Sequence, residues 1–280
     1  MTDASTDRDT PDFIYGTAWK EDETADLTKL ALECGFRGID TANQRKHYHE
    51  AGVGEAITEA VDEGLVERDE LFLQTKFTYE AGQDHRLPYD PEAPLADQVE
   101  QSFESSLDHL GVEFIDSYIL HGPSSRVGLG EADREVWEAM TALAESGRVG
   151  AIGISNVSPG QVENLVDWAD LPPAFVQNRC FARTEWGRNV REICRANDIV
   201  YQGFSLLTAN VQALQTDDIA RIAKRHDKTI PQVVFRFASQ IGILPLTGTT
   251  SEEHMRRDLA CFDFELDDSE LDVIENIATA

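Results

Sequence analysis

The chain has 280 residues, 41% of them hydrophobic, which is enough for one large α/β domain with a sizeable core. Its 24 basic and 52 acidic residues give a net charge of −28 at pH 7, and such a surface repels nucleic acids and anionic membranes. The charge therefore predicts no nucleic-acid or membrane partner. No stretch of about 18 apolar residues is present, so the sequence predicts no membrane-spanning helix.

Residues 1–12 are polar and acidic, with neither a basic segment nor an apolar core of the kind found in signal peptides. We expect them to form a short disordered tail. Residues 13–280 show no sharp change in composition, and we expect a single domain there. Four cysteines without metal-type spacing predict reduced thiols and a cytoplasmic location: Cys34, Cys180, Cys194 and Cys261.

Eight short apolar segments alternate with amphipathic segments along the chain. Strands are expected at 13–16, 37–41, 71–76, 114–120, 149–154, 175–177, 199–204 and 243–246. Helices are expected at 22–34, 51–63, 96–110, 134–146, 158–169, 189–196, 217–225 and 231–240, after Ser251, and at 266–277. The loop 79–94 is rich in Pro and Asp and is expected to be too polar for the core.

This alternation predicts parallel strands joined by helices, and eight such units predict an α/β fold of the (β/α)8 TIM-barrel type. An open doubly wound sheet is the competing architecture. It usually has a glycine-rich GxGxxG loop after its first strand, whereas here the first strand ends in Gly16-Thr17-Ala18-Trp19. The barrel is therefore the favoured fold.

Polar or aromatic side chains follow every predicted strand. In a barrel these strand ends meet at one rim, so the residues are expected to form a site together. They are Trp19, Asp40, Lys76, His121, Ser155 with Asn156, Gln177, Phe204 with Ser205, and Thr247.

The loop after Asp40 is dense in groups that exchange protons, including His47, Tyr48 and His49. We expect Asp40, Lys76, His121 and a nearby tyrosine to form one hydrogen-bonded unit. In that unit the lysine cation lowers the pKa of the phenol and makes it a better proton donor. Elsewhere on the rim, amide and hydroxyl groups are suited to hold a carboxamide, an aromatic ring to stack on it, and the turn at 247–251 to bind phosphate.

Six motifs in order resemble the aldo-keto reductases: GFRGIDTA, LFLQTK, DSYILHGP, GISN, VQN and LPLTGTT. The resemblance implies a (β/α)8 barrel that reduces an aldehyde or ketone to an alcohol with NADPH, or alternatively with NADH. It implies Asp40, Tyr48, Lys76 and His121 as the catalytic residues. It implies that the cofactor is bound by Gly16, Thr17, Ala18, Asp40, Ser155, Asn156, Gln177, Phe204, Ser205, Leu207, Leu246, Thr247, Gly248, Thr249, His254 and Asp258.

Two departures from the family pattern leave alternatives open. The loop after Asp40 is two residues longer than in many members, so counting from its two ends places Arg45 or His47 at the tyrosine position. Tyr48 is the loop's one tyrosine and is assigned as the proton donor, with His47 as the alternative. Leu246 and His254 stand where NADPH-preferring members carry basic residues, and the nearby arginines Arg256 and Arg257 are candidates to supply that charge.

Two other functions are weighed against this one. A barrel with the same features could bind the cofactor without catalysis and act as a sensor or subunit. A metal-dependent hydrolase would use His47 and His49 with Asp40, Lys76 and His121. The fifth and sixth strands lack the histidines, and the eighth strand the aspartate, that such sites usually need, so no metal is predicted.

The acidic residues are spread over every predicted helix. Concentrated salt screens their repulsion, because the Debye length falls to roughly 3 Å at 1 M. We therefore expect a cytoplasm of high ionic strength, as in a halophile, with an acidic protein of an ordinary cytoplasm as the alternative. The expected partner is a small carbonyl or alcohol substrate, and the expected state is a monomer or a weak homo-oligomer.

Overall fold

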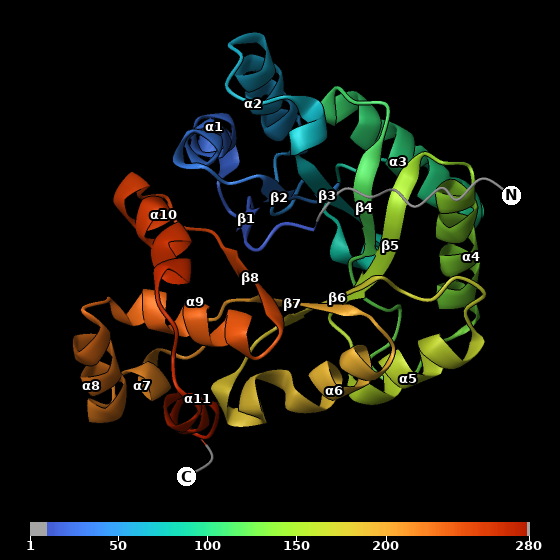
Figure 1. The fold of residues 1–280 in the computed structure, drawn as a ribbon. Helices are drawn as coiled ribbons and strands as arrows, with labels where there is room; N and C mark the ends of the chain where they lie inside the picture. The colour runs from blue at the N-terminus through green and yellow to red at the C-terminus, as the bar shows by residue number, and fades with distance from the viewer. Residues whose placement is uncertain (1–9, 279–280) are drawn as a thin grey trace, which may run out of the picture.

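The computed structural model describes residues 10–278, which form a closed barrel of eight parallel strands ringed by helices (Figure 1). The predicted (β/α)8 barrel is therefore confirmed, and residues 1–9 of the predicted tail lie outside the described part. Each strand pairs with its neighbours in the chain, and β8 pairs with β1. The strands are β1 Ile14–Gly16, β2 Gly38–Asp40, β3 Phe72–Phe77, β4 Ile115–Leu120, β5 Val149–Ser155, β6 Phe175–Arg179, β7 Val200–Phe204 and β8 Ile243–Thr247.

The helices follow the predicted segments closely. They are α1 Thr24–Cys34, α2 Glu50–Asp62, α3 Leu95–Leu110, α4 Glu131–Glu145, α5 Pro159–Trp168, α6 Arg188–Ala196, α7 Val211–Leu214, α8 Asp217–His226, α9 Ile230–Gln240, α10 Glu252–Leu259 and α11 Asp268–Glu275. The short α7 was not predicted. Helix α4 begins at Glu131 instead of Arg134, because the Asp133 carboxylate accepts a hydrogen bond from the backbone N–H of Gly130 at 2.9 Å and caps the first turn.

One expectation about the loops is wrong. The loop 79–94 contributes Tyr89 to the core, where this side chain is 6% exposed and packs on Phe77 with ring centroids 5.6 Å apart. Its hydroxyl donates to the backbone oxygen of Thr78 at 2.7 Å. The polar composition of the loop gave no sign of this contact, because it depends on a single aromatic residue.

The barrel interior is built in layers, since alternate residues of each strand face the axis. Strand β6 shows the pattern: Phe175 lies in an apolar interior cluster, Gln177 lies above it in a polar layer, and Arg179 ends the strand at the cavity. The interior apolar cluster consists of Ile14, Phe72, Ile119, Phe175, Leu244 and Leu246. The bottom of the barrel is thus closed by apolar packing, and the site lies at the carboxyl ends of the strands.

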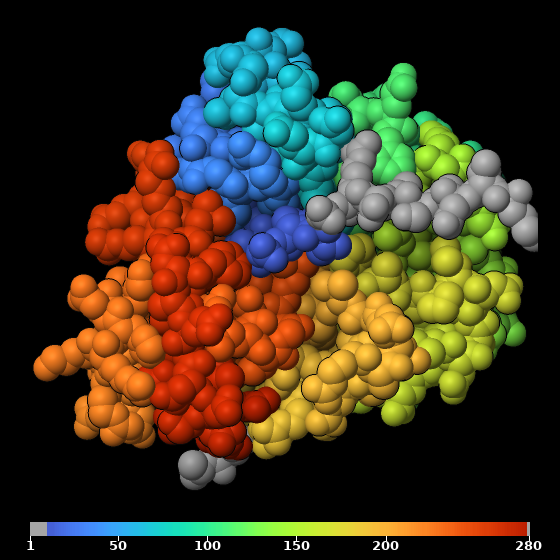
Figure 2. All heavy atoms as spheres, viewed as in Figure 1, coloured from blue at the N-terminus to red at the C-terminus, as the bar shows by residue number. Residues whose placement is uncertain are grey.

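A second and larger apolar core fills the space between the strands and the helices. The ring of helices closes between α1 and α10, which pack against each other (Figures 1 and 2). Within residues 10–278, no helix combines the length and the apolar character needed to cross a bilayer.

Candidate active site

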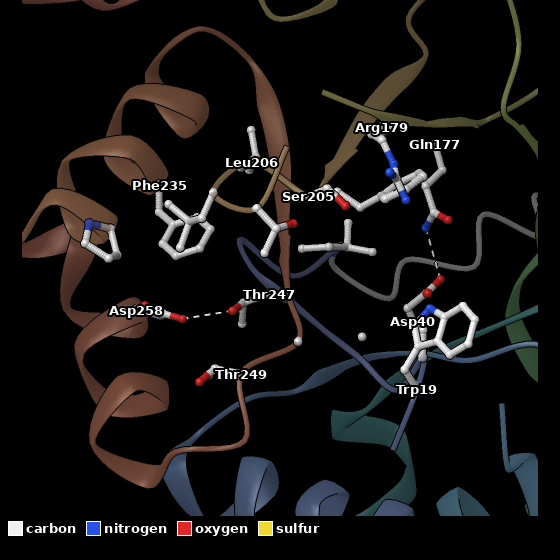
Figure 3. A pocket seen from close by; sticks show the side chains of 18 of the residues that line it. Trp19, Asp40, Gln177, Arg179, Ser205, Leu206, Phe235, Thr247, Thr249 and Asp258 are labelled. Carbon is white, nitrogen blue, oxygen red and sulfur yellow. Dashed lines mark hydrogen bonds between the residues drawn. The ribbon is translucent and has the colours of Figure 1, made fainter. Parts of the chain in front are cut away.

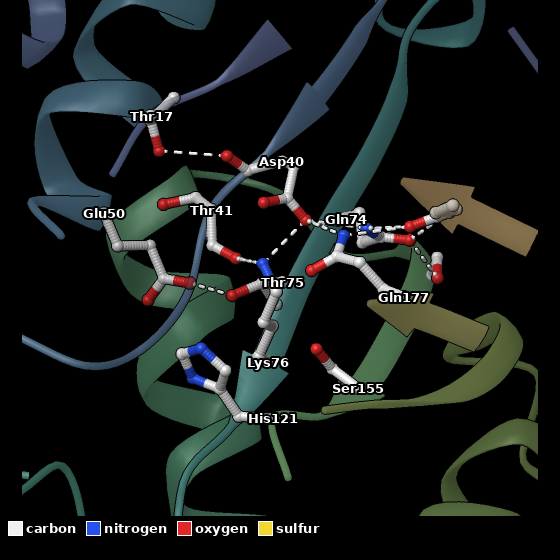
Figure 4. Close-up of polar contacts among 12 residues, drawn as sticks. Thr17, Asp40, Thr41, Glu50, Gln74, Thr75, Lys76, His121, Ser155 and Gln177 are labelled. Carbon is white, nitrogen blue, oxygen red and sulfur yellow. Dashed lines mark hydrogen bonds and ion pairs between the residues drawn. The ribbon is translucent and has the colours of Figure 1, made fainter. Parts of the chain in front are cut away.

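A layer of glutamine side chains supports the site from below. Gln74, Gln177 and Gln202 face inward from three strands and exchange hydrogen bonds of 2.9 Å through Gln202. Gln74 and Gln177 also donate to Oδ1 of Asp40 at 2.6 and 3.0 Å (Figure 4). Buried amides whose N–H groups are paired in this way hold one arrangement of the carboxylate.

Asp40 and Lys76 form a buried ion pair on this layer. The ammonium of Lys76 donates to Oδ1 of Asp40 and to the backbone oxygen of Thr41, both at 2.6 Å, and its side chain is 1% exposed. Burial lowers the pKa of Lys76, while the charge of Asp40 opposes that change. A buried pair that lost one partner would leave an unpaired charge, so the two residues act as a unit.

Tyr48 and His121 lie against this pair, as the sequence predicted. Nζ of Lys76 is 5.3 Å from the centroid of the Tyr48 ring, and the rings of Tyr48 and His121 are 5.9 Å apart at 71°. The hydrogen bonds differ from the single unit that we expected. In the described structure they join Asp40 to Lys76, whereas His121 Nδ1 is paired with the hydroxyl of Thr78 at 2.7 Å.

The pKa values of the two rings are set mainly by burial. Burial raises the pKa of Tyr48, and the charge of Asp40 adds to the effect. This direction is opposite to the predicted one, because burial of the phenol is the largest effect on its pKa. Burial lowers the pKa of His121 to about 3, assisted by the positive charge of Lys76. At neutral pH the site therefore presents a protonated phenol and a neutral imidazole.

His47 occupies a different place from Tyr48. Its ring stacks on Trp19 with centroids 3.9 Å apart, and its backbone oxygen accepts from the N–H of Trp19 at 2.7 Å. Burial and the charge of Lys46 lower the pKa of His47. Trp19 is 69% exposed, so this stacked pair forms an outer wall of the cavity while Tyr48 lies over Lys76.

A cavity of about 800 Å³ runs from this cluster along the barrel rim (Figure 3). Asp40 and Trp19 lie at one end, and Thr249 and Asp258 lie at the other. The predicted site residues that line it are Gly16, Ala18, Asp40, Tyr48, His121, Ser155, Asn156, Gln177, Phe204, Ser205, Leu207, Leu246, Thr247, Gly248, Thr249, His254 and Asp258. The two exceptions are Lys76, which lies beneath Tyr48, and Thr17, whose hydroxyl donates inward to the backbone oxygen of Asp40 at 3.0 Å.

Other lining residues were not predicted. Arg179 was not predicted because the strand was expected to end at Gln177. Thr229, Pro231 and Phe235 come from the beginning of α9, which packs beside β8. A Thr-x-Pro sequence at a helix start was the available signal, and Phe235 looked like any core residue.

Two amide groups face the cavity from neighbouring strand ends, Asn156 after β5 and Gln177 on β6. Nδ2 of Asn156 donates to the backbone oxygen of His121 at 2.7 Å and to the hydroxyl of Ser155 at 3.0 Å. Gln177 uses its Nε2 for Asp40 and Gln202, so its Oε1 is the atom available to accept from a ligand. The ring of Phe204 on the next strand offers a flat apolar surface beside these amides.

The far end of the cavity is formed by the turn between β8 and α10. The hydroxyl of Thr247 donates to Asp258 at 2.9 Å, and burial raises the pKa of Asp258 to about 6. Lys20, which was not predicted, donates to the backbone oxygen of Gly248, and burial lowers its pKa. The turn is thereby fixed both to the loop after β1 and to α10.

The two candidate arginines of α10 differ in position. Arg257 lines the cavity and pairs with Glu253 at 2.6 Å. Arg256 pairs with Glu252 at 2.9 Å outside the cavity. Of the two, Arg257 is therefore the one that can reach a bound ligand.

Three residues of the cavity wall hold a left-handed backbone without being glycine. They are Trp19, Asn156 and Ser205, with φ of 63°, 58° and 58°. Such conformations cost on the order of 1–3 kcal/mol each and concentrate at functional sites. Each follows a strand end, so the strain turns the chain at the rim.

No group of three or more His, Cys, Asp or Glu side chains within residues 10–278 is placed to hold a metal ion. His47 faces Trp19, and Nδ1 of His49 lies 3.2 Å from the backbone oxygen of Glu21. The ligand set of the hydrolase alternative is therefore not assembled in the described structure.

Comparison with solved structures places the barrel among known enzymes. The aldo-keto reductase MGS-M4, from a Medee basin deep-sea metagenome library, shares 27% identity with a TM-score of 0.83, covering 97% of this chain and 92% of that one. The aldo-keto reductase AKR2E5, crystallised with NADPH, shares 25% identity with a TM-score of 0.81, covering 96% and 84%.

Sequence comparison agrees. The chain is 30% identical over 254 residues to the oxidoreductase YtbE of Bacillus subtilis (strain 168), covering 90% of this chain and 83% of that protein. The model of the aldo/keto reductase family matches residues 13–279. With its barrel and its rim of strand-end residues, this chain belongs to the aldo/keto reductase family.

Proposed function

We propose that this enzyme reduces an aldehyde or ketone to an alcohol, with NADPH as the reductant. The observation that carries the proposal is the position of Tyr48 and His121 against the buried Asp40–Lys76 pair, at one end of a long cavity. Proton donors at one end of a site large enough for a cofactor and a small substrate suit carbonyl reduction.

The cavity residues fit a dinucleotide. Phe204 presents a ring for stacking, and Oε1 of Gln177 can accept from a carboxamide. The turn 247–251 before α10 offers hydroxyls and backbone N–H groups for a phosphate. The NADPH complex of AKR2E5 supports the same assignment, with NADH as the alternative.

Bound NADPH supplies the hydride that reduces the carbonyl carbon. Tyr48 gives its proton to the carbonyl oxygen, and the Lys76 cation on the face of its ring stabilises the phenolate that remains. Asp40 keeps Lys76 charged and in place. When Thr78 donates to Nδ1 of His121, the ring proton lies on Nε2, which can donate to the same carbonyl oxygen.

The preference for NADPH is proposed to depend on α10. Its first turn carries Glu252 and Glu253, which repel a phosphate. Arg257 neutralises Glu253 and lines the cavity, so its guanidinium is the group proposed to meet the extra phosphate of NADPH.

We further propose that the enzyme works in a cytoplasm of high ionic strength as a monomer or weak homo-oligomer. The support is the net charge of −28 spread over the surface. At low salt this charge destabilises the compact chain through self-repulsion.

The proposal is tested by measuring oxidation of NADPH and NADH with a panel of aldehydes and ketones, in dilute buffer and in about 1 M KCl. Oxidation that requires the carbonyl compound is the expected result. Cofactor binding without turnover on any of them would favour the sensor function instead. Chelator-sensitive hydrolysis without nicotinamide would favour the hydrolase.

A further inference from the structure

Arg179 ends β6 inside the barrel rim. It lies two residues after Gln177, so both side chains face the barrel axis, and Arg179 stands one layer, roughly 6–7 Å, above Gln177. Since Gln177 bonds to Asp40, Arg179 sits above the floor of the proposed catalytic cluster. Figure 3 shows it at the same end of the cavity as Asp40 and Trp19, away from Asp258 and Thr249.

The charge of Arg179 has no counter-ion in the part of the chain that the structure describes. Within residues 10–278, no carboxylate forms an ion pair with its guanidinium, although acids outnumber bases 52 to 24 in the chain. The guanidinium makes a cation–π contact with Phe204, whose ring centroid is 5.6 Å from the guanidinium carbon. Such a contact holds the guanidinium while leaving its N–H donors free for an anion.

Two other charges at the cavity are balanced. Asp40 is paired with Lys76 at 2.6 Å, and Arg257, the other Arg or Lys that lines the cavity, is paired with Glu253 at 2.6 Å. Arg179 therefore contributes one uncompensated positive charge at the catalytic end of the cavity. The surface of this acidic protein repels anions, whereas this charge attracts an anion into the cavity.

We propose that Arg179 is a specificity-determining residue that binds a carboxylate on the carbonyl substrate. The inference rests on the proposed reductase function and names its substrate class: aldehydes or ketones that carry a carboxylate a few bonds from the reacting carbon. The planar fork of a guanidinium matches the two oxygens of a carboxylate. Binding of that group turns the carbonyl oxygen toward Tyr48 and His121.

The test compares matched pairs of aldehydes that differ in charge: succinic semialdehyde with butanal, and para-formylbenzoate with para-tolualdehyde. Wild type should favour the charged member of at least one pair. Arg179→Gln should reduce kcat/KM for that charged aldehyde about 10- to 100-fold, since a charge-assisted hydrogen bond is lost. The neutral aldehyde should change by less than about threefold, and Arg179→Lys should recover part of the loss.

Arg183→Gln is the matched control. Arg183 lies four residues further along the same connection, with its guanidinium 4.0 Å from the ring of Phe181, but it does not line the cavity. The Arg183→Gln variant removes the same kind of charge from a position close to Arg179 in the chain. If Arg183→Gln produced the same selective loss, the effect would be a long-range field and the assignment to Arg179 would be wrong.

A second readout does not depend on turnover. Calorimetry measures binding of para-(hydroxymethyl)benzoate and of para-methylbenzyl alcohol to the protein saturated with NADP. The benzoate should bind more tightly to wild type, and Arg179→Gln should remove that difference. This arm decides the inference even if none of the aldehydes is reduced, in which case the proposed function fails on its own.

Two further results would overturn the inference. Equal losses on charged and neutral aldehydes, together with weaker NADPH binding by fluorescence titration, would assign Arg179 to a phosphate of the cofactor. Unchanged kinetics and unchanged benzoate binding would show that the guanidinium takes no anion.

Discussion

Tyr48 and His47 are neighbours in one loop, yet they lie in different environments. Tyr48 packs over the Lys76 ammonium and beside His121, whereas His47 stacks on the exposed ring of Trp19. Spacing alone could not separate these residues, because the loop is longer than the family pattern. The deciding information is three-dimensional: only one of the two rings can lie above a lysine that is buried on another strand.

Tyr48→Phe keeps the ring and removes the proton. We expect kcat to fall about 10²- to 10⁴-fold, the usual contribution of general acid catalysis. The dissociation constant for NADPH should stay nearly constant, because the lost interaction belongs to the transition state. Steady-state kinetics and fluorescence titration measure the two quantities. Lys76→Met should act in the same direction, since it removes the charge that stabilises the phenolate.

His47→Ala is the control for this prediction. It removes a ring from the cavity wall, so a milder effect is expected, mainly on KM. The assignment of the proton donor is wrong if His47→Ala abolishes turnover while Tyr48→Phe does not. In that case a titration closer to neutrality should appear in the pH–rate profile.

The pKa values of His121 and His109 should be shifted in opposite directions from that of a free histidine. Burial lowers the pKa of His121 from 6.5 to about 3, so its ring stays neutral and its NMR signals stay flat between about pH 5 and 8. The hydrogen bond from His109 to Glu50, at 3.0 Å, raises the pKa of His109, so its signals should move at a pH above 6.5.

Nitrogen–proton correlation spectra of the free protein, with signals assigned through His121→Asn and His109→Asn, measure both midpoints. Since the folded His121 gives up its proton more readily than an exposed histidine, it adds no inflection near neutrality to the pH–rate profile. A His121 midpoint near 6.5 would contradict this and would show that water reaches the ring.

At the scale of elements, the site residues at the strand ends could be predicted from the sequence, whereas those on the helices could not. The strand ends follow from short apolar runs that stop at a polar residue, so Asp40, His121 and Ser155 could be placed on one rim. Phe235 could not, because an apolar residue of a helix carries no sign of which partner it faces. Arg179 was missed since β6 runs two residues beyond Gln177, where the strand was expected to end.

The α10 helix gives an element-scale prediction about cofactor choice. Arg257→Gln should weaken NADPH more than NADH, by about tenfold in KM, because it removes the cation proposed to meet the extra phosphate. It also leaves Glu253 unpaired at the cavity, which adds repulsion toward NADPH. The ratio of kcat/KM for the two cofactors measures the effect.

Arg256→Gln is the matched control. It breaks an ion pair of the same i,i+4 kind, with Glu252, on the same helix but outside the cavity. Its cofactor ratio should stay close to that of wild type. If both variants shift the ratio equally, the helix acts through its overall charge and not through the position of Arg257.

At the scale of the whole molecule, the acidic residues crowd together where helices meet. A surface groove between α2 and α3 is lined by Glu55, Glu59, Asp62, Glu63 and Asp108. Lys29 pairs with Glu59 and Glu63 at 2.7 and 2.9 Å, but the other three carboxylates form no ion pair within residues 10–278. Exposed pairs contribute only about 0–1 kcal/mol each, so they do not offset repulsion on this scale.

Stability and activity should therefore rise with KCl. The Debye length falls from about 10 Å at 0.1 M to about 3 Å at 1 M, so repulsion between exposed carboxylates is screened. We expect the Tm to rise by at least about 5 °C over that range, since 1 kcal/mol corresponds to roughly 2–4 °C for a domain of this size. A variant carrying Glu55→Gln, Asp62→Asn and Asp108→Asn should show a smaller rise, because part of the repulsion is already gone. Sucrose, which carries no charge, separates screening from general solvent exclusion. Full stability and activity in dilute buffer, with no dependence on KCl, would contradict the high-salt proposal.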